Sequence, residues 1–299
     1  MSAVTSAMPV DIHSRMSPEE FYSDYVNKKP LVMQGAVSGF PAVSRWSLEY
    51  LASLAPDLRV RLKTGVVRDG HTTTARLEDY CRIVAEWEER AAAPGEADEP
   101  PPYLHDLPLL TMIPRLLDDL EGFPAEYFPK FFQNRWWKFT QFFVGPSGAL
   151  TPLHFDTLLT HNLFFQISGT KRFVMVHPGD RDRCYINNWR WSSVDPDGPD
   201  TERYPRFCGA RVLTCLVEAG DVLYMPPGTL HKVMSLTSSI SFNLDWHDRS
   251  SALRSLIAAM DGMPARNLRY NLLFTLGVIG KVPSAVLMPA LKSYYTYVS

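Results

Sequence analysis

The sequence contains little cysteine: four residues of this type in a chain of 299, at positions 81, 184, 208 and 215. No two of them form a CxxC pair or a zinc-knuckle spacing, which argues against a disulfide framework and a cysteine-based zinc site. The opening stretch Met1–Met16 lacks a basic segment followed by an apolar one, so no secretory signal is visible. These absences predict a soluble protein of the reducing cytoplasm.

Long apolar runs and an excess of one charge are missing as well. The most apolar late segment, Asn271–Gly280, stops after ten residues at Lys281, whereas a membrane span needs roughly twenty. The 30 basic and 32 acidic residues give a net charge of -2, which provides no general attraction to nucleic acid or to an anionic membrane. We therefore expect neither as a partner.

What the sequence does contain is a series of short strand-like segments. Eight segments between Lys138 and Trp246 are rich in β-branched and aromatic residues and are separated by Gly, Pro, Asp or Ser turns. This spacing predicts a mainly β fold, a sandwich or barrel of the jelly-roll kind. We divide the chain into an N-terminal α/β elaboration (1–137), a β core (138–247) and a C-terminal helical segment (248–299).

Helices are predicted on both sides of the β core. Ser17 is the expected N-cap of an early helix, and Ser250 is the expected N-cap of a helix that ends near Gly262. The C-terminal segments are so apolar that they must pack against something. Two interpretations stay open: they cover the barrel, or they form the interface of a homodimer.

Two motifs of the β core combine into a candidate metal site. His154 and Asp156 alternate on a predicted strand, so their side chains point to the same face. His231 follows a Pro-Pro-Gly turn at the start of another predicted strand. Two histidines and one carboxylate form the facial triad that holds Fe(II) and leaves positions open for a co-substrate and O2. In the alternative interpretation, both histidines are core residues and Asp156 belongs to a turn.

A lysine within an apolar strand segment narrows the chemistry. A buried Lys171 needs an anion, because an unpaired ammonium group is expensive to bury. A dicarboxylate such as 2-oxoglutarate would chelate iron at one end and present its far carboxylate to Lys171, with the Thr151 hydroxyl as a second donor. Asn162 and Asn243 lie in strand segments, where asparagine is depleted, and could hydrogen-bond the metal-bound end. Alternatively, Lys171 extends along the surface to reach solvent.

Aromatic residues and arginines flank the expected mouth of the barrel. Such groups suit a peptide or an amino-acid-like substrate, although the tryptophans could also pack a loop onto the barrel. The candidates for the substrate wall are Trp136, Trp137, Trp189, Arg190, Trp191 and Arg203.

Several motifs, in this order along the chain, resemble the jumonji-C and cupin-like family of Fe(II)- and 2-oxoglutarate-dependent oxygenases. They are GALTPLHFD, NLFFQISGTKRFVMVHP, ERYPRF, GDVLYMPPGTLHKV and SISFNLDW. The resemblance covers roughly residues 17–247. It is nearest to the branch of the asparaginyl hydroxylase that inhibits the hypoxia-inducible factor, and it implies a double-stranded β-helix, the jelly-roll core of cupins.

The resemblance also implies a role for each candidate residue. Tyr103 is similar to a tyrosine that contacts the far carboxylate of 2-oxoglutarate in that branch, whereas the segment around Asn243 fits only with a one-residue slip, which leaves its orientation open. The implied iron ligands are His154, Asp156 and His231, and the implied 2-oxoglutarate residues are Lys171, Thr151, Asn162, Asn243 and Tyr103.

The implied reaction oxidises a substrate C–H bond with O2 and couples this to the decarboxylation of 2-oxoglutarate to succinate and CO2. The family includes protein, peptide, RNA-base and small-metabolite hydroxylases, and the near-neutral charge makes RNA the least favoured substrate. We expect hydroxylation of a peptide or protein side chain or of an amino-acid-like metabolite.

Two alternatives of other classes stay open. A metal-binding cupin with other chemistry, such as an isomerase or a cofactor-free dioxygenase, would keep the triad but have no use for Lys171. A non-catalytic binding module would tolerate loss of the triad with its interaction intact.

Overall fold

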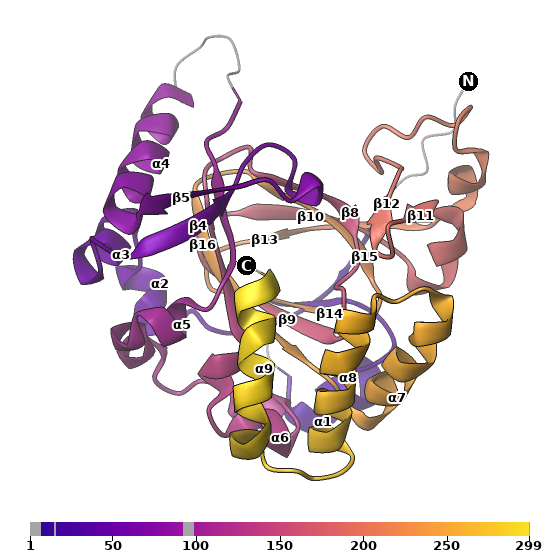
Figure 1. Cartoon of the computed structure of the whole chain (residues 1–299). Helices are drawn as coiled ribbons and strands as arrows, with labels where there is room; N and C mark the ends of the chain where they lie inside the picture. The colour runs from indigo at the N-terminus through magenta and orange to yellow at the C-terminus, as the bar shows by residue number, and fades with distance from the viewer. Residues whose placement is uncertain (1–6, 15, 92–98, 299) are drawn as a thin grey trace.

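The computed structural model describes residues 7–14, 16–91 and 99–298, and its fold is mainly β. Two sheets surround a central space, and helices pack on the outside of them (Figure 1). The prediction of a mainly β, jelly-roll core is therefore confirmed. The division of the chain at 137/138 and 247/248 stays a prediction.

All eight predicted core segments form strands. They are β7 (Thr140–Gly145), β8 (Leu150–His154), β9 (His161–Ser168), β10 (Lys171–Val176), β13 (Val212–Val217), β14 (Val222–Met225), β15 (Leu230–Ser235) and β16 (Ser239–Trp246).

The core strands divide between the two sheets in the manner of a double-stranded β-helix. One sheet contains them in the order β13-β10-β15-β8, and the other in the order β14-β9-β16-β7. All neighbours in these two series are antiparallel. Successive strands alternate between the sheets except β10 and β13, so residues distant in the sequence face one interior.

The N-terminal region extends the second sheet at both ends. Strands β2 (Asp11–His13) and β3 (Leu31–Met33) continue it beyond β14, and β6 (Tyr103–Leu107), β4 (Arg59–Lys63) and β5 (Thr72–Arg76) continue it beyond β7. The short β1 (Met8–Pro9) joins the first sheet beside β13.

Short helices connect these strands and cover the outer face of the second sheet. Ser17 caps the first of them, as predicted, because its Oγ accepts a hydrogen bond from the Glu20 amide at 3.2 Å. The α-helices are α1 (Pro18–Asp24), α2 (Pro41–Arg45), α3 (Leu48–Leu54), α4 (Leu77–Ala91), α5 (Leu109–Met112) and α6 (Lys130–Gln133). The 3-10 helices are η1 (Val67–Asp69), η2 (Pro114–Leu120), η3 (Ala125–Tyr127) and η4 (Trp136–Phe139).

The long segment between β10 and β13, which we call the insert, has structure of its own. It contains η5 (Pro178–Arg183), β11 (Ile186–Asn187), β12 (Trp191–Ser192) and η6 (Pro205–Gly209). The β11–β12 hairpin is attached to the first sheet, where Trp191 is paired with His154 at the end of β8. The insert therefore lies at the end of the barrel that carries the candidate metal ligands.

The C-terminal helices are α7 (Arg249–Ile257), η7 (Ala258–Asp261), α8 (Ala265–Val278) and α9 (Ser284–Val298). The expected cap was wrong: Asp248 caps α7, and its Oδ1 accepts a hydrogen bond from the Ser251 amide at 2.6 Å. Because the helix begins at Arg249, Ser250 already lies in its first turn, where it accepts a hydrogen bond from Arg254. No helix in the described part of the chain is long and apolar enough to cross a bilayer.

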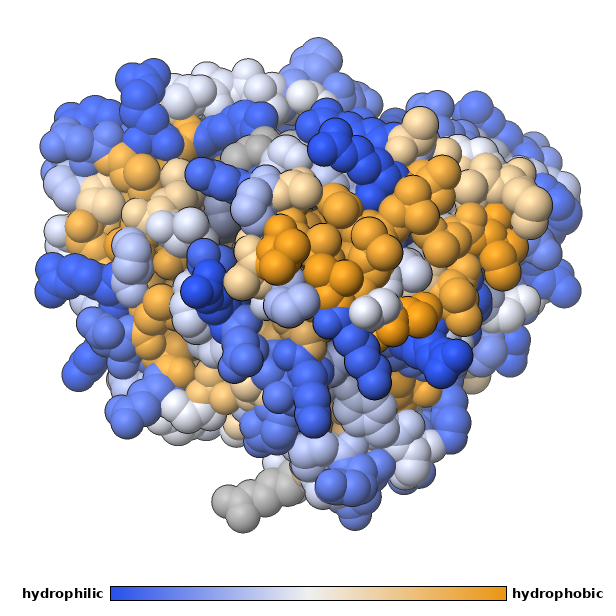
Figure 2. Space-filling model, turned by 60° about the horizontal axis from the view of Figure 1, so that its bottom comes forward, coloured by the Kyte–Doolittle hydropathy of each residue, from blue (hydrophilic) through white to orange (hydrophobic). Residues whose placement is uncertain are grey.

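These helices have one packed face and one exposed apolar face. Tyr270 and Phe274 of α8 are buried in the main apolar core, where the Phe274 ring stacks on Phe132 with centroids 5.8 Å apart. Figure 2 shows apolar side chains gathered on the opposite, solvent-facing side. We call this surface the apolar face; the exposed large apolar residues of these helices are Leu253, Ile257, Met260, Leu272, Leu276 and Val286.

Candidate metal centre and its pocket

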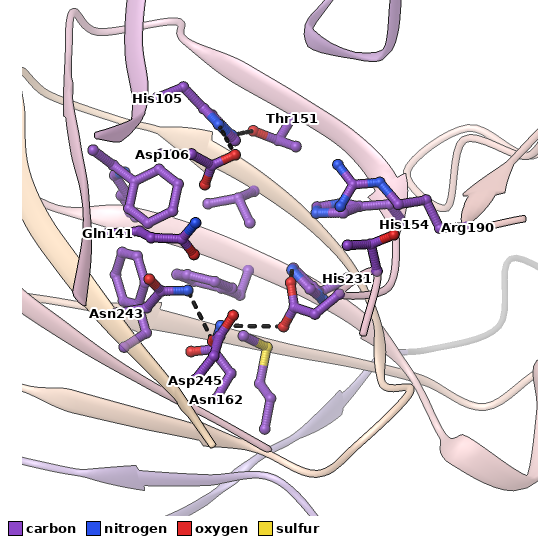
Figure 3. Close-up of a pocket in the computed structure, with 18 of the residues that line it drawn as sticks. His105, Asp106, Gln141, Thr151, His154, Asn162, Arg190, His231, Asn243 and Asp245 are labelled. Carbon is purple, nitrogen blue, oxygen red and sulfur yellow. Dashed lines mark hydrogen bonds and ion pairs between the residues drawn. The ribbon is translucent and has the colours of Figure 1, made fainter. Parts of the chain in front are cut away.

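A pocket opens inside the barrel, lined by strands of both sheets (Figure 3). Its wall contains the whole predicted triad and all five residues predicted to hold 2-oxoglutarate. These eight residues are His154, Asp156, His231, Lys171, Thr151, Asn162, Asn243 and Tyr103.

The three predicted metal ligands converge on one point. His154 and His231 are paired across β8 and β15, and their ring centroids are 4.3 Å apart. Nε2 of His231 lies 3.9 Å from Oδ1 of Asp156, and one ligand atom from each residue lies within 4.8 Å of the other two. β8 ends at His154, so Asp156 belongs to the turn that follows rather than to the strand. The side chains nevertheless meet, because this turn directs the carboxylate back towards the imidazoles.

Hydrogen bonds prepare both imidazoles for a metal. Nδ1 of His154 lies 2.8 Å from the Pro152 carbonyl oxygen, and Nδ1 of His231 lies 3.0 Å from that of Thr229. A carbonyl only accepts, so Nδ1 carries the proton in each ring and Nε2 keeps a free lone pair. Burial, helped by the nearby His231, lowers the pKa of His154 well below its usual value and keeps it neutral. The donor set fits Fe(II), which this combination of ligands holds in other proteins.

The carboxylate of the triad is also held in place. Nδ2 of Asn162 donates to Oδ2 of Asp156 at 3.1 Å, as the dashed line in Figure 3 shows. A hydrogen bond of this kind orients a metal-binding carboxylate. It leaves Oδ1, the atom nearest His231, directed towards the point where the ligands converge.

Lys171 forms a second centre in the same pocket. It is 1% exposed, and its Nζ donates to the Tyr103 hydroxyl at 2.9 Å. Within the described ranges no carboxylate forms an ion pair with it, and aromatic rings, including those of Phe143 and Phe164, surround it at 5.3–5.4 Å. Burial lowers the pKa of Lys171 to about 7. A buried ammonium group without an acid is a site for an anion.

Two amides leave oxygen atoms open towards this space. Asn243 lines the pocket, so the question of its orientation is answered: a register shift between Ile240 and Ser241 accompanies the inward placement. Oδ1 of Asn162 and Oδ1 of Asn243 are buried without a hydrogen-bond partner in the described structure. Buried polar atoms are rarely left unpaired, so a polar ligand fits between them.

The pocket also contains residues that the sequence analysis missed. Asp245 follows Asn243 by two residues on β16 and accepts a hydrogen bond from its Nδ2 at 3.1 Å. Burial, together with the nearby Asp156 charge, raises the pKa of Asp245 well above its usual value. Residues two apart on a strand share a face, so the inward position of Asn243 was the signal for Asp245. His105, Asp106 and Gln141 are among the other missed residues.

The candidate substrate residues lie in three different places: at the pocket, in a neighbouring groove and on the outside of the second sheet. Arg190 lines the pocket, and the Trp191 ring packs over His154 with centroids 4.9 Å apart. Trp189 and Arg203 line a neighbouring groove instead.

The prediction for Trp136 needs a correction, since neither Trp136 nor Trp137 lines the pocket or that groove. Both pack against the main apolar core, where the Trp136 ring stacks on Phe123 with centroids 3.5 Å apart. The physical reason is that η4 precedes β7 on the outside of the second sheet.

Comparisons with known proteins agree with this geometry. A family model described as Cupin-like domain matches residues 18–252. Similar proteins include the tRNA wybutosine-synthesizing protein 5 of Homo sapiens, 26% identical over 80% of this chain and 78% of its own length. The bifunctional peptidase and (3S)-lysyl hydroxylase JMJD7 of Homo sapiens is 27% identical over 80% of this chain and 83% of its own.

A third relative is the lysine-specific demethylase JMJ30 of Arabidopsis thaliana, which is 28% identical over 82% of this chain and 56% of its own length. The family model spans both the N-terminal strands and the β core. The chain therefore belongs to the Cupin-like domain family and has jumonji-C proteins among its relatives.

Proposed function

We propose that the protein is an Fe(II)- and 2-oxoglutarate-dependent oxygenase that hydroxylates a peptide or protein side chain or an amino-acid-like metabolite. One observation carries the proposal: a triad within 4.8 Å shares a pocket with a buried lysine that has no acidic partner in the described residues. The names of two relatives, a lysyl hydroxylase and a lysine-specific demethylase, support oxidative chemistry of this type.

His154, Asp156 and His231 would hold the metal through two Nε2 atoms and one carboxylate oxygen. Bound there, Fe(II) would supply the activation of O2 that couples 2-oxoglutarate decarboxylation to oxidation of a substrate C–H bond. The protein contributes fixed ligands, since the Pro152 and Thr229 carbonyls orient the imidazoles before the metal arrives.

Lys171 and Tyr103 would bind the far carboxylate of 2-oxoglutarate. The ammonium supplies the charge, and the Tyr103 hydroxyl stays protonated because burial raises its pKa well above the usual value. The Thr151 hydroxyl lines the same pocket. The aromatic rings around Lys171 keep water away, which strengthens the charge pairing.

The residues around the pocket opening indicate the substrate class. Arg190 and Trp191 stand at the pocket mouth and suit a peptide or an amino-acid-like molecule. One relative is named for tRNA modification, but a net charge of -2 gives this chain little general attraction to RNA. The nearness to the asparaginyl hydroxylase branch also stays a proposal.

The test is the formation of succinate from 2-oxoglutarate by the purified full-length protein in the presence of Fe(II), ascorbate and O2. Wild type should form succinate, whereas His154→Ala and Lys171→Met should not. Lys63→Met is the matched control, because Lys63 is partly buried on β4 outside the pocket lining.

Succinate formation that survives both pocket substitutions would contradict the proposal. A cupin with other chemistry predicts a different result, namely metal binding that depends on His154 while Lys171→Met has no effect on activity. A non-catalytic module predicts no succinate from any variant.

A further inference from the structure

A second hollow lies beside the pocket and is lined mainly by the insert. It is an open groove of about 910 Å³. Three arginines line it, Arg181, Arg203 and Arg206, together with two carboxylates, Asp182 and Asp261. The groove therefore has a surplus of positive charge on a chain whose net charge is -2.

The three groove arginines have no ion-pair partner within 4.0 Å in residues 7–14, 16–91 and 99–298. Three of the other carboxylates of the insert are paired with cations that do not line the groove. Asp180 binds Arg211 at 2.8 Å, and Asp195 and Asp197 both bind Lys232, at 2.6 and 2.7 Å. The positive charge of the groove is thus left for a ligand.

Aromatic rings hold these guanidinium groups in place. Arg206 lies 4.5 Å from the ring centroid of Tyr185, and Arg203 lies 5.2 Å from that of Tyr204. Arg181 lies 4.1 Å from a phenylalanine ring. A guanidinium plane that rests on a ring keeps its N–H donors at the edge and loses less freedom when it binds.

The groove lies next to the reaction pocket. The Trp189 indole lines the groove and donates to the Thr157 carbonyl oxygen at 3.0 Å, and Thr157 lines the pocket. The next residue, Arg190, lines the pocket, and Trp191 packs over His154. One wall therefore separates the groove from the metal ligands.

The backbone of the groove wall is strained. Tyr185, Asn188 and Trp189 have positive φ angles of 50°, 44° and 71°. For bulky residues such as tyrosine and tryptophan this left-handed conformation is unfavourable and tends to occur at functional sites. In this conformation the hairpin presents Trp189 to the groove.

We propose that this arginine groove binds an acidic segment of a peptide or protein substrate while the side chain to be oxidised enters the neighbouring pocket. The inference rests on the proposed function and names its substrate class. Carboxylates spaced along a peptide match separate guanidinium groups, which bind them through paired hydrogen bonds.

Nucleic acid fits the groove less well. The Tyr185 ring is covered by Arg206 and packs against Tyr204 with centroids 5.0 Å apart, so it is not free to stack on a base. Asp182 and Asp261 would also face phosphates that recur at every nucleotide. A flexible peptide can instead turn its carboxylates towards the arginines and away from these two carboxylates.

The test is fluorescence anisotropy of labelled deca-glutamate with the full-length protein, with a Gly-Ser repeat of equal length and oligouridine as comparison ligands. Wild type should bind deca-glutamate best, and more weakly as salt increases. Arg203→Gln/Arg206→Gln should weaken this binding by about 2- to 30-fold, since each exposed charge pair contributes about 0.2–1 kcal/mol. Arg82→Gln/Arg90→Gln is the matched control, because both arginines are exposed on α4 and Arg90 also lies over a ring, that of Trp87.

Three results would overturn the groove assignment: equal binding of the Gly-Ser repeat, binding unaffected by the groove substitutions, or tighter oligouridine binding that those substitutions abolish. Different results would contradict the proposed oxygenase function. Asp156→Ala should keep the affinity for deca-glutamate, so peptide binding without succinate formation by wild type contradicts the oxygenase alone. Succinate formation without peptide binding contradicts the groove alone.

Discussion

Lys171 shows how a single residue can favour binding over stability. The ammonium group lies among aromatic rings, and its one hydrogen bond in the described structure goes to Tyr103 rather than to an acid. Burying such a group without an anion is unfavourable. The buried charge therefore lowers the stability of the free protein, and a bound dicarboxylate would remove this penalty. Mutation can separate the effect on stability from the effect on binding.

Lys171→Met should maintain or increase the stability of the free protein and weaken its binding of 2-oxoglutarate. Methionine fills similar volume without charge, so the free energy of unfolding without ligand should equal or exceed that of wild type. The affinity for 2-oxoglutarate should fall by about 2–5 kcal/mol, the usual effect of removing one partner of a buried charge pair. Urea denaturation and calorimetric titration measure the two quantities. A variant that is clearly less stable but binds 2-oxoglutarate normally would show that the lysine is structural.

The pH dependence of 2-oxoglutarate binding should follow the same residue. Burial lowers the pKa of Lys171 to about 7, and only the charged form attracts the carboxylate. The charged fraction falls with rising pH, so between pH 7 and 9 each unit should weaken binding about tenfold until the higher pKa of the complex is reached. Titration in this range should show the slope in wild type and none in Lys171→Met. A flat wild-type profile would contradict the lowered pKa.

At the scale of elements, helix α4 fixes the strands that carry the Lys171 partner. The Tyr80 hydroxyl of α4 donates to the Val144 carbonyl on β7 at 2.6 Å and accepts from the Leu104 amide on β6 at 3.1 Å. Gly145 completes the arrangement, because a Cβ there would lie 2.5 Å from the Tyr103 ring. The glycine thus leaves room for the ring that contacts the lysine.

Tyr80→Phe should therefore weaken the fold more than the loss of one hydroxyl suggests. It leaves a buried carbonyl and a buried amide unpaired, each at about 1–3 kcal/mol, so the free energy of unfolding should fall by about 2–4 kcal/mol. Urea denaturation measures it. Tyr22→Phe is the control, since its hydroxyl donates to the Tyr127 carbonyl in a half-buried place and its loss should cost less. Equal losses of unfolding free energy in the two variants would contradict the stabilising role of the Tyr80 hydroxyl.

At the scale of the whole molecule, the apolar face on the C-terminal helices stands out (Figure 2). Met260 is 81% exposed and Val286 is 65% exposed. The same helices cover the core with their other side, through Phe274 and Leu291, so covering the core does not explain the exposed side. Contiguous exposed apolar surface of this kind indicates a protein partner, and the homodimer remains our prediction for it.

Leu272→Glu/Leu276→Glu tests the homodimer. Both residues are 49% exposed and lie one turn apart on α8, so the charges should disrupt a self-association without disturbing the core. Analytical ultracentrifugation should find a dimer for wild type and a monomer for the variant, with the same circular dichroism for both. A wild type that stays monomeric at high concentration would rule out the homodimer.

The sequence analysis was most accurate where local pattern decides the structure. Strand periodicity and turn residues are local, so all eight core strands were predicted. Asp156 lies in a turn because β8 ends at His154, the residue paired with Trp191 of the insert. This pairing joins residues that are distant in the sequence, so local pattern does not show it. Trp136 was misplaced because composition does not show which side of a sheet a helix covers. Asp245 was missed because the orientation of Asn243 was left open, and Asp245 shares its face of β16.

The most direct test of the central claim is an anaerobic titration of the full-length protein with Fe(II) and 2-oxoglutarate, monitored by visible absorption. If His154, Asp156 and His231 hold one iron beside the Lys171 anion site, the weak charge-transfer band of the iron chelate should appear at stoichiometric iron in wild type and be absent in Asp156→Ala. Wild type without a band at saturating iron and 2-oxoglutarate, or an identical band in Asp156→Ala, would contradict the account.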